Sequence, residues 1–290
     1  MSIRDQILPI AAGQTLFDVL RTIGVDAVEL LVDFNQFVPY VRGEEAIAYS
    51  VRDAESTRQL RRRFETERMR ISALLVNTDF CADDAPAHVK WATRVVQAAG
   101  ELEVPVVRID PLTVKRSFAS SQVRENLISS LRQILDQTAG SRVDLGLENH
   151  GPLANDEQFL DEVLNALAGP RVGLTLDTGN FYWWGYPLAD VYRLIEKYAA
   201  RAKHTHVKNV NYPPALAREK RPIGHEYKQY CSTLIDGNLD LRRVAQILCD
   251  AGYRRDLCVE DESLFKFPQA ERVQVLRRDV AALRAAMTPQ

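Results

Sequence analysis

Short apolar runs alternate along this chain with longer segments in which apolar residues recur at helical spacing. The runs are rich in Val, Ile and Leu, and several end at a polar or charged residue, which is typical of buried strands. Eight such runs predict β-strands over residues 6–11, 27–32, 71–76, 104–109, 143–148, 172–177, 202–207 and 257–260.

Amphipathic segments fill the intervals between these runs. They predict helices over residues 52–70, 84–99, 121–138, 156–167, 188–200, 239–251 and 268–287. Strands that alternate with helices imply parallel strands joined by right-handed crossovers. About eight such units in 290 residues predict an α/β protein with a single (β/α)8 TIM-barrel domain over residues 1–290.

A doubly wound open sheet is the structural alternative to the barrel. Its nucleotide-binding form carries G-x-G-x-x-G after an early strand. Here Ala12-Gly13-Gln14-Thr15 follows the first predicted strand, and this does not match. The longest irregular stretch, residues 209–238, leaves the seventh predicted strand. Long loops in compact domains often serve binding, so we expect this stretch to border the mouth of the barrel.

Polar side chains stand at the ends of four consecutive predicted strands. These ends read GLENHG, LTLDTGN, HTHVKN and LCVEDES, and they place Glu148, Asp177, His206 and Glu260 where an apolar strand stops or is interrupted. The first three are evenly spaced, about one βα unit apart. Because the carboxyl ends of barrel strands face one mouth, we expect these four side chains to point to the same rim.

Three carboxylates that converge on one point repel one another, and a bound cation removes that cost. An oxygen-rich ligand set with one imidazole suits Mn²⁺, Mg²⁺, Co²⁺ or Zn²⁺. The alternative is that these residues form separate ion pairs or helix N-caps. Four polar strand ends in series make that alternative less favourable. The sequence therefore predicts one divalent metal ion, with Mn²⁺ as the first choice.

These strand ends resemble a known family. The motifs Glu148-Asn149-His150, Asp177-Thr178-Gly179-Asn180, His204-Thr205-His206-Val207-Lys208-Asn209 and Glu260-Asp261-Glu262 are similar to those of the xylose isomerase-like TIM-barrel superfamily. Within it, the chain most resembles the sugar phosphate isomerase/epimerase family, which includes ketose 3-epimerases, hydroxypyruvate isomerase and inosose dehydratase. The resemblance covers most of the chain. It implies a metal held by Glu148, Asp177, His206 and Glu260, with His206 matching the histidine of the family's H-x-K-D strand end.

The chain also departs from the family's pattern. Asn180 stands where the ketose epimerases have the histidine of a D-x-x-H motif, and an amide cannot take over a histidine's proton transfer. Asn209 replaces the usual acid after Lys208, and the G-x-G-x-I-D segment survives only loosely at residues 235–240. These departures leave the substrate open.

Several further residues are candidates for substrate binding, and each has a structural alternative. His204 and Arg108 lie on predicted strands, where a buried hydrogen bond or a salt bridge would also explain them. Trp183 follows a strand, and its ring could stack on a sugar or cover the core. We expect the 209–238 stretch to bring Tyr212, Arg221 or His225 toward the substrate. The candidates are Arg108, His150, Asn180, Trp183, His204, Lys208 and Arg221, with Glu29 and Asn77 as weaker additions.

The resemblance implies an isomerase or epimerase that acts on a small keto-sugar or polyol through an enediolate. Glu148 and Glu260 would then be the acid–base pair beside the metal. The same groups could expel a β-hydroxyl or a glycoside leaving group, which would make the protein a dehydratase or lyase. A non-catalytic sugar-binding barrel and an apurinic endonuclease-like enzyme are the remaining alternatives. The endonuclease needs a trinuclear zinc site rich in histidine, and this chain has five histidines.

Composition narrows the class of partner. Thirty-seven Lys and Arg residues against 39 Asp and Glu give a net charge near −2, so a global basic field for nucleic acid is absent. No apolar run reaches the length of a membrane helix, the N-terminus does not read as a signal peptide, and the four cysteines show no CxxC spacing. We expect a cytoplasmic protein with a small-molecule sugar substrate, and the family suggests a homo-oligomer.

Overall fold

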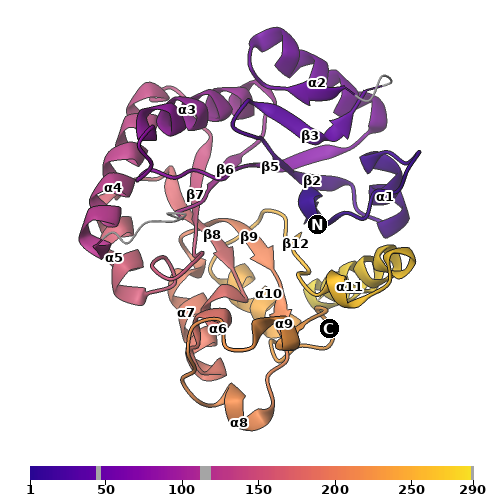
Figure 1. Ribbon diagram of the computed structural model, residues 1–290, viewed down its shortest axis with the longest axis vertical. Coiled ribbons are helices and arrows are strands. Elements are labelled where there is room, and N and C mark those ends of the chain that lie inside the picture. Colours follow the sequence, from indigo (N-terminus) through magenta and orange to yellow (C-terminus); the bar gives the residue numbers. More distant parts are fainter. Residues whose placement is uncertain (44–46, 112–118, 289–290) are drawn as a thin grey trace.

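Eight parallel strands close into a barrel in the computed structural model, which describes residues 1–43, 47–111 and 119–288 (Figure 1). The order around the barrel is β1, β12, β9, β8, β7, β6, β5 and β2. The predicted α/β fold class and TIM-barrel architecture are confirmed. The strands are β1 (Ser2–Arg4), β2 (Ala27–Leu31), β5 (Arg70–Val76), β6 (Val106–Ile109), β7 (Asp144–Glu148), β8 (Val172–Asp177), β9 (Ala202–Val207) and β12 (Cys258–Val259).

Helices surround this barrel and bury its outer face. Their apolar stripes pack against Val, Leu and Ile side chains of the strands, which explains why the strands read as continuous apolar runs. The first and last helices pack against each other, so the two ends of the chain meet in the ring (Figure 1). The long helices are α1 (Leu16–Ile23), α2 (Ala54–Glu67), α3 (Ala85–Glu101), α4 (Ser120–Gln137), α5 (Glu157–Ala166), α7 (Leu188–Ala199), α10 (Leu241–Asp250) and α11 (Arg272–Met287).

Seven of the eight predicted strands and all seven predicted helices are confirmed, with differences of a few residues at their ends. The first predicted strand, residues 6–11, is wrong, because the barrel strand is β1 and a 3-10 turn, η1 (Asp5–Ile7), follows it. Asp5 is buried there, and its carboxylate accepts a hydrogen bond from the Leu31 N–H at 2.8 Å. The earlier start places Arg4 at the carboxyl end of the strand.

Helix α1 and a hairpin outside the barrel are among the elements that the sequence did not predict. A capping box begins α1, since the Thr15 hydroxyl accepts from the Asp18 N–H and the Asp18 carboxylate accepts from the Thr15 N–H. A hairpin of β3 (Phe37–Arg42) and β4 (Ala48–Ser50) follows β2 outside the barrel. Neither element alters the order of the eight barrel strands.

The irregular stretch 209–238 contains only short elements, which are β10 (Asn209–Val210), α8 (Pro214–Ala217), α9 (Tyr227–Tyr230) and β11 (Cys231–Ser232). Asn209 holds it together: its amide donates to the Leu234 and Leu239 carbonyls, and its oxygen accepts from the Val210 and Leu239 N–H groups. A Cβ at Gly237 would lie 2.0 Å from the Asn209 side chain, so only glycine fits there. The two hydrogen bonds that the Asn209 amide donates need an N–H group, which explains why an asparagine stands at position 209 instead of an acid.

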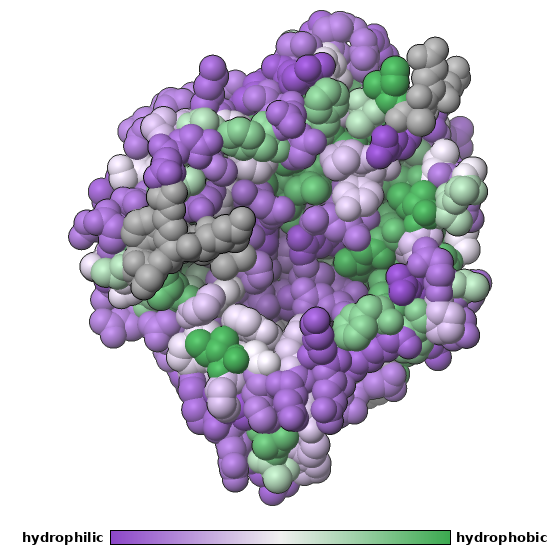
Figure 2. All heavy atoms as spheres, in the orientation of Figure 1, coloured by the Kyte–Doolittle hydropathy of each residue, from purple (hydrophilic) through white to green (hydrophobic). Residues whose placement is uncertain are grey.

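Hydrophilic residues line a hollow near the centre of the molecule, on the face drawn in Figure 2. Among the described residues, no helix is both long enough and apolar enough to cross a membrane.

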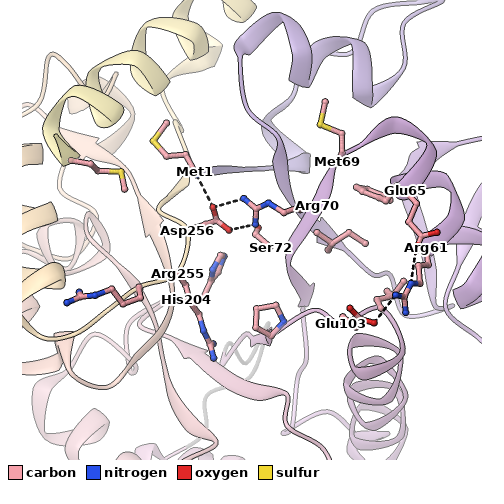
Figure 3. A pocket seen from close by; sticks show the side chains of 16 residues that line it. Met1, Arg61, Glu65, Met69, Arg70, Ser72, Glu103, His204, Arg255 and Asp256 are labelled. Atoms are coloured by element: carbon pink, nitrogen blue, oxygen red, sulfur yellow. Dashed lines mark hydrogen bonds and ion pairs between the residues drawn. The ribbon is translucent and has the colours of Figure 1, made fainter.

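A cavity of about 720 Å³ lies at the N-terminal end of the barrel, where the strands begin (Figure 3). Two of its arginines are paired with carboxylates: Arg70 with Asp256 at 3.1 Å, and Arg61 with Glu103 at 2.7 Å. In TIM barrels this face serves stability, whereas chemistry occupies the opposite end. We therefore place the functional site at the carboxyl ends of the strands.

Candidate metal centre and active site

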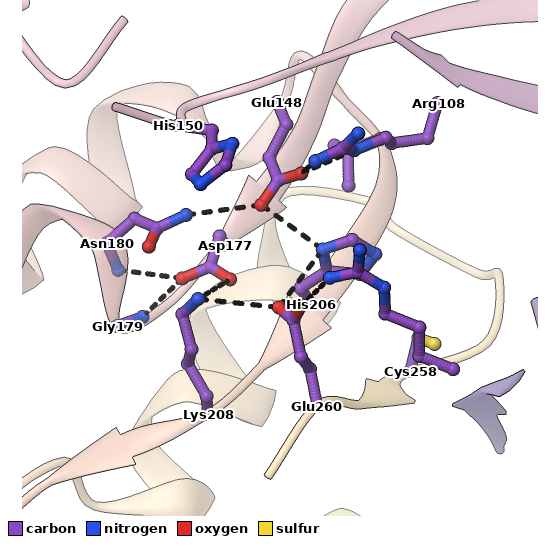
Figure 4. Close-up of polar contacts among 12 residues, drawn as sticks. Arg108, Glu148, His150, Asp177, Gly179, Asn180, His206, Lys208, Cys258 and Glu260 are labelled. Atoms are coloured by element: carbon purple, nitrogen blue, oxygen red, sulfur yellow. Dashed lines mark hydrogen bonds and ion pairs between the residues drawn. The ribbon is translucent and has the colours of Figure 1, made fainter. Parts of the chain in front are cut away.

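The four predicted metal ligands meet at the carboxyl ends of neighbouring strands (Figure 4). Glu148 and Asp177 are the last residues of β7 and β8, His206 lies one residue before the end of β9, and Glu260 directly follows β12. One ligand atom from each lies within 4.8 Å of the others, and all four side chains are buried. The even spacing along the sequence thus becomes a single cluster in space.

The donor atoms of this cluster fit a divalent ion. His206 Nδ1 lies 3.3 Å from both Glu148 Oε1 and Glu260 Oε2. His206 Nδ1 and Asp177 Oδ2 are buried and make no hydrogen bond to any described residue, and their nearest charged neighbours lie 3.3 Å away. Buried polar atoms without a hydrogen bond are costly unless something else satisfies them. Three carboxylates and one imidazole form a ligand set that suits Mn²⁺, Mg²⁺, Co²⁺ or Zn²⁺.

A cation from the protein contacts each of the three carboxylates. Arg108 binds Glu148, Arg4 binds Glu260, and Lys208 Nζ lies 3.3 Å from Asp177 Oδ2. Arg4 was missed from the sequence because the first strand was placed too late. Its position directly after Ile3, close to the start of the chain, was the signal available in the sequence.

These charges shift the pKa values of the carboxyl groups in opposite directions. Burial alone would raise the pKa of Glu148, but the charges of Arg108 and His206 outweigh burial and hold it well below its usual range. Burial raises the pKa of Asp177 despite the opposing charge of Lys208. The two carboxyl groups therefore differ in proton affinity within one cluster.

Glu29 approaches the imidazole of His206 from the interior of the barrel. Its Oε2 lies 2.8 Å from His206 Nε2, on the ring edge opposite Glu148 and Glu260. Burial opposes the charged imidazolium, yet the charges of Glu29 and Glu148 raise the pKa of His206 to about 9. A carboxylate that accepts from one ring nitrogen fixes the tautomer and orientation of a ligating histidine. Glu29, a weak candidate from the sequence, is thus a positioning residue for His206.

Lys208 and Asn180 lie within the cluster itself. Lys208 Nζ also contacts Glu262 at 3.2 Å, and the ammonium is fully buried among carboxylates. A Cβ at Gly179 would lie 2.6 Å from Lys208 Cγ, so the glycine leaves room for this side chain. Asn180 Nδ2 donates to Glu148 Oε1 at 3.1 Å. Asn180 therefore orients a glutamate, a role that an amide can fill.

Arg108 and His150 border the cluster on the side of β6 and β7. Arg108 is buried and also contacts Asp110 at 3.1 Å and Asn77 Oδ1 at 3.0 Å. His150 Nδ1 lies 3.1 Å from Asp110 Oδ1, and its side chain is 34% exposed. Its exposure leaves part of the ring accessible beside the cluster.

Three other residues that were predicted to bind substrate make their contacts outside the cluster. His204 faces Glu29 at 3.4 Å and lines the N-terminal cavity, below the cluster. The Arg221 guanidinium donates to backbone carbonyls of Leu216, Glu219, Tyr182 and Tyr186, so it binds the 209–238 stretch to α6 (Asn180–Trp184) and the residues after it. The Trp183 indole lies against Gly224 of the same stretch.

Besides Arg4, the structure adds Tyr227 and Asn149, to which the sequence assigned no role. Tyr227 donates from its hydroxyl to Glu262, so the 209–238 stretch reaches the cluster through Tyr227 rather than through Tyr212 or His225. Asn149 accepts from the Asp177 N–H at 2.7 Å and donates to the Asp177 carbonyl at 3.0 Å. Its place between Glu148 and His150 was visible in the sequence, but its partner became visible only in the fold.

A closed parallel barrel with an acid-and-histidine cluster at its carboxyl ends defines the class of this protein. The family described as the xylose isomerase-like TIM barrel matches residues 17–286. The chain therefore belongs to the xylose isomerase-like TIM-barrel family. No curated protein sequence matches it.

Solved structures share this fold at low sequence identity. The IolI protein with a bound zinc atom is 15% identical, with a TM-score of 0.73, over 100% of this chain and 99% of that one. An L-ribulose 3-epimerase is 16% identical, with a TM-score of 0.67, over 99% and 94%. Mannonate dehydratase from Streptococcus suis is 13% identical, with a TM-score of 0.68, over 100% and 95%. At these sequence identities, the similarity shows only that the proteins share a fold.

Proposed function

We propose that this protein is a divalent-metal-dependent isomerase or epimerase acting on a small keto-sugar or polyol through an enediolate. The observation that carries the proposal is the convergence of Glu148, Asp177, His206 and Glu260 within 4.8 Å at the carboxyl ends of the barrel strands. An L-ribulose 3-epimerase with the same fold supports the sugar class.

Glu148, Asp177, His206 and Glu260 would hold the ion, with Mn²⁺ as the first choice and Mg²⁺, Co²⁺ or Zn²⁺ as alternatives. When bound, a divalent ion supplies Lewis-acid polarisation of a substrate carbonyl. Asn149 and Glu29 contribute by fixing Asp177 and His206, through bonds of 2.7 Å and 2.8 Å. Ligands held in this way need little reorganisation when the ion enters.

Glu148 and Glu260 are the proposed acid–base pair. Both face the same edge of the His206 imidazole, each 3.3 Å from its Nδ1, so they flank the point where the ion and the substrate carbonyl would be held. One glutamate removes the proton from the carbon beside the carbonyl, and the other returns a proton to the enediolate. Arg108 and Arg4 hold the two carboxylates in place.

Elimination of a β-hydroxyl is the second candidate reaction, and Lys208 is the observation that favours it. Burial opposes its charge, yet the neighbouring Asp177 and Glu262 raise the pKa of this ammonium above its ordinary value. This lysine stays charged beside the cluster, where its ammonium can stabilise the negative charge that develops on a leaving hydroxyl. Mannonate dehydratase shares the fold.

Proton exchange at carbon tests the proposal. The Mn²⁺-loaded protein is incubated in D₂O with a panel of ketoses and inososes, and NMR follows deuterium at the carbon beside the carbonyl. Since one acid–base group typically contributes ~10²–10⁴-fold, Glu148→Gln and Glu260→Gln should slow turnover by at least about 100-fold. Glu162→Gln, on the outer helix α5, is the control and should keep its turnover. Product without deuterium, at undiminished rates in both variants, would refute the mechanism.

A further inference from the structure

A cleft of about 360 Å³ lies beside the carboxyl ends of β2 and β5 and is closed on its outer side by α3. Val32, directly after β2, is fully buried in its wall, and Asn77 directly follows β5. Because both strand ends belong to the same rim as the metal centre, the cleft opens on the functional face. Its volume is at the lower end of the range for small-molecule sites.

Aromatic rings form the walls of this cleft. The Phe34 ring lies 5.0 Å from the His88 ring and 5.3 Å from the Trp91 ring, measured between centroids. His88 and Trp91 share one face of α3, while Phe34 comes from the loop after β2 and remains 44% exposed. Flat aromatic faces bind the apolar C–H faces of ring-shaped ligands.

Trp91 forms a buried wall of the cleft. Its side chain is only 4% exposed, and its indole N–H is buried without a hydrogen-bond partner among the described residues. The ring rather than the N–H is therefore the part of Trp91 that a ligand in the cleft would contact.

Asn77 and Arg108 lie between the cleft and the metal centre. Asn77 lines the cleft, and its side-chain oxygen accepts from Arg108 at 3.0 Å. Arg108 in turn binds Glu148 of the centre. A ligand in the cleft is therefore separated from the acid–base pair by only two side chains.

Charge selects the kind of ligand. Asp33 and Asp84 lie at the cleft, and the described lining residues include no lysine or arginine. Carboxylates repel phosphates and sugar acids, whereas they accept hydrogen bonds from neutral hydroxyls. Aromatic walls and acidic edges together fit an uncharged sugar ring.

We propose that this cleft binds a neutral pyranose ring, as the second ring of a glycoside or disaccharide whose first ring occupies the metal centre. The inference rests on the proposed function, because it assigns the first ring to that centre. It makes the substrate larger than a free ketose and assigns its specificity to Phe34, Trp91 and Asn77.

The indole N–H signals of the full-length protein test this inference. The ¹⁵N-labelled, Mg²⁺-loaded protein is titrated over the millimolar range with maltose as the neutral probe and glucose 6-phosphate as the anionic one. Trp183→Phe and Trp184→Phe assign the Trp91 signal by elimination, since the chain has three tryptophans. Maltose should shift the Trp91 signal with saturation, and glucose 6-phosphate should leave it unchanged.

Phe34→Ala should weaken maltose binding about three- to tenfold, the value of one aromatic contact. Phe265→Ala is the matched control, because Phe265 is 56% exposed and does not line the cleft. A Trp91 signal that maltose does not move, in protein that still exchanges deuterium into a ketose, overturns the cleft and leaves the proposed reaction standing. A Trp91 response that depends on Phe34, in protein without deuterium exchange, supports the cleft and refutes the reaction.

Discussion

Glu29 orients His206 within the candidate metal centre. It lies on β2, is fully buried, and accepts from His206 Nε2, which leaves Nδ1 facing Glu148 and Glu260. The opposing charge of His206 and the hydrogen bond from His204 outweigh burial and keep the pKa of Glu29 far below its usual range. A permanently charged acceptor therefore orients the one imidazole of the ligand set.

Glu29→Gln should weaken Mn²⁺ binding about 10- to 100-fold, the usual effect of losing such a partner. The amide keeps the shape of the side chain but loses the charge that favours one tautomer. Isothermal titration of Mn²⁺ into chelator-treated protein measures the change. Glu262→Gln is the control, because Glu262 contacts Lys208 but none of the four ligands directly, and it should change the affinity much less. Equal affinities of Glu29→Gln and the unchanged protein would contradict this role.

At the scale of elements, Asn209 fixes the 209–238 stretch on the barrel. Its amide both donates to and accepts from the backbone, with two bonds of each kind. A carboxylate could only accept, so it would face the Leu234 and Leu239 carbonyls without a proton to share. The stretch carries Tyr227, and through it the contact with Glu262.

Asn209→Asp should therefore lower the free energy of unfolding by about 1–3 kcal/mol, the cost of leaving buried polar groups unpaired. Urea unfolding followed by circular dichroism measures it. Asn211→Asp is a matched control two residues along the same stretch, since Asn211 is exposed and its side-chain oxygen only accepts from Asn238. If both variants lose the same stability, Asn209 does not hold the stretch in the way described.

The elements also show what the sequence could predict. Apolar runs located seven strands because parallel barrel strands are buried on both faces, and acids at their ends located the centre because strand ends share a rim. The first strand was misplaced because buried Asp5 interrupts the apolar pattern just where β1 ends. The partners of Arg221 could not be predicted, since a guanidinium can bind carbonyls or a substrate and only the fold decides between them.

At the scale of the whole molecule, Asp5 links global stability to pH. Burial raises the pKa of Asp5 to about 8, with the charge of Glu29 adding to it and the Leu31 N–H opposing it. The unfolded chain loses this proton above about pH 4, whereas the folded protein keeps it until about pH 8. The folded state binds more protons across that window, so stability is complete below it and falls as the pH rises.

Asp5→Asn should flatten this dependence by up to ~1.4 kcal/mol per pH unit. The amide resembles the neutral carboxyl group and can still accept from the Leu31 N–H. Urea unfolding at several pH values within the window measures both slopes. Identical slopes for the variant and the unchanged protein would show that Asp5 does not titrate in this way.

The central claim is that one divalent ion occupies the cluster of Glu148, Asp177, His206 and Glu260. Its most direct test is the metal content of protein reloaded with Mn²⁺ after chelation, measured by mass spectrometry together with protein concentration. We predict about one ion per chain and sharply reduced content in His206→Ala and Asp177→Asn. Undiminished metal content in both variants would contradict the account.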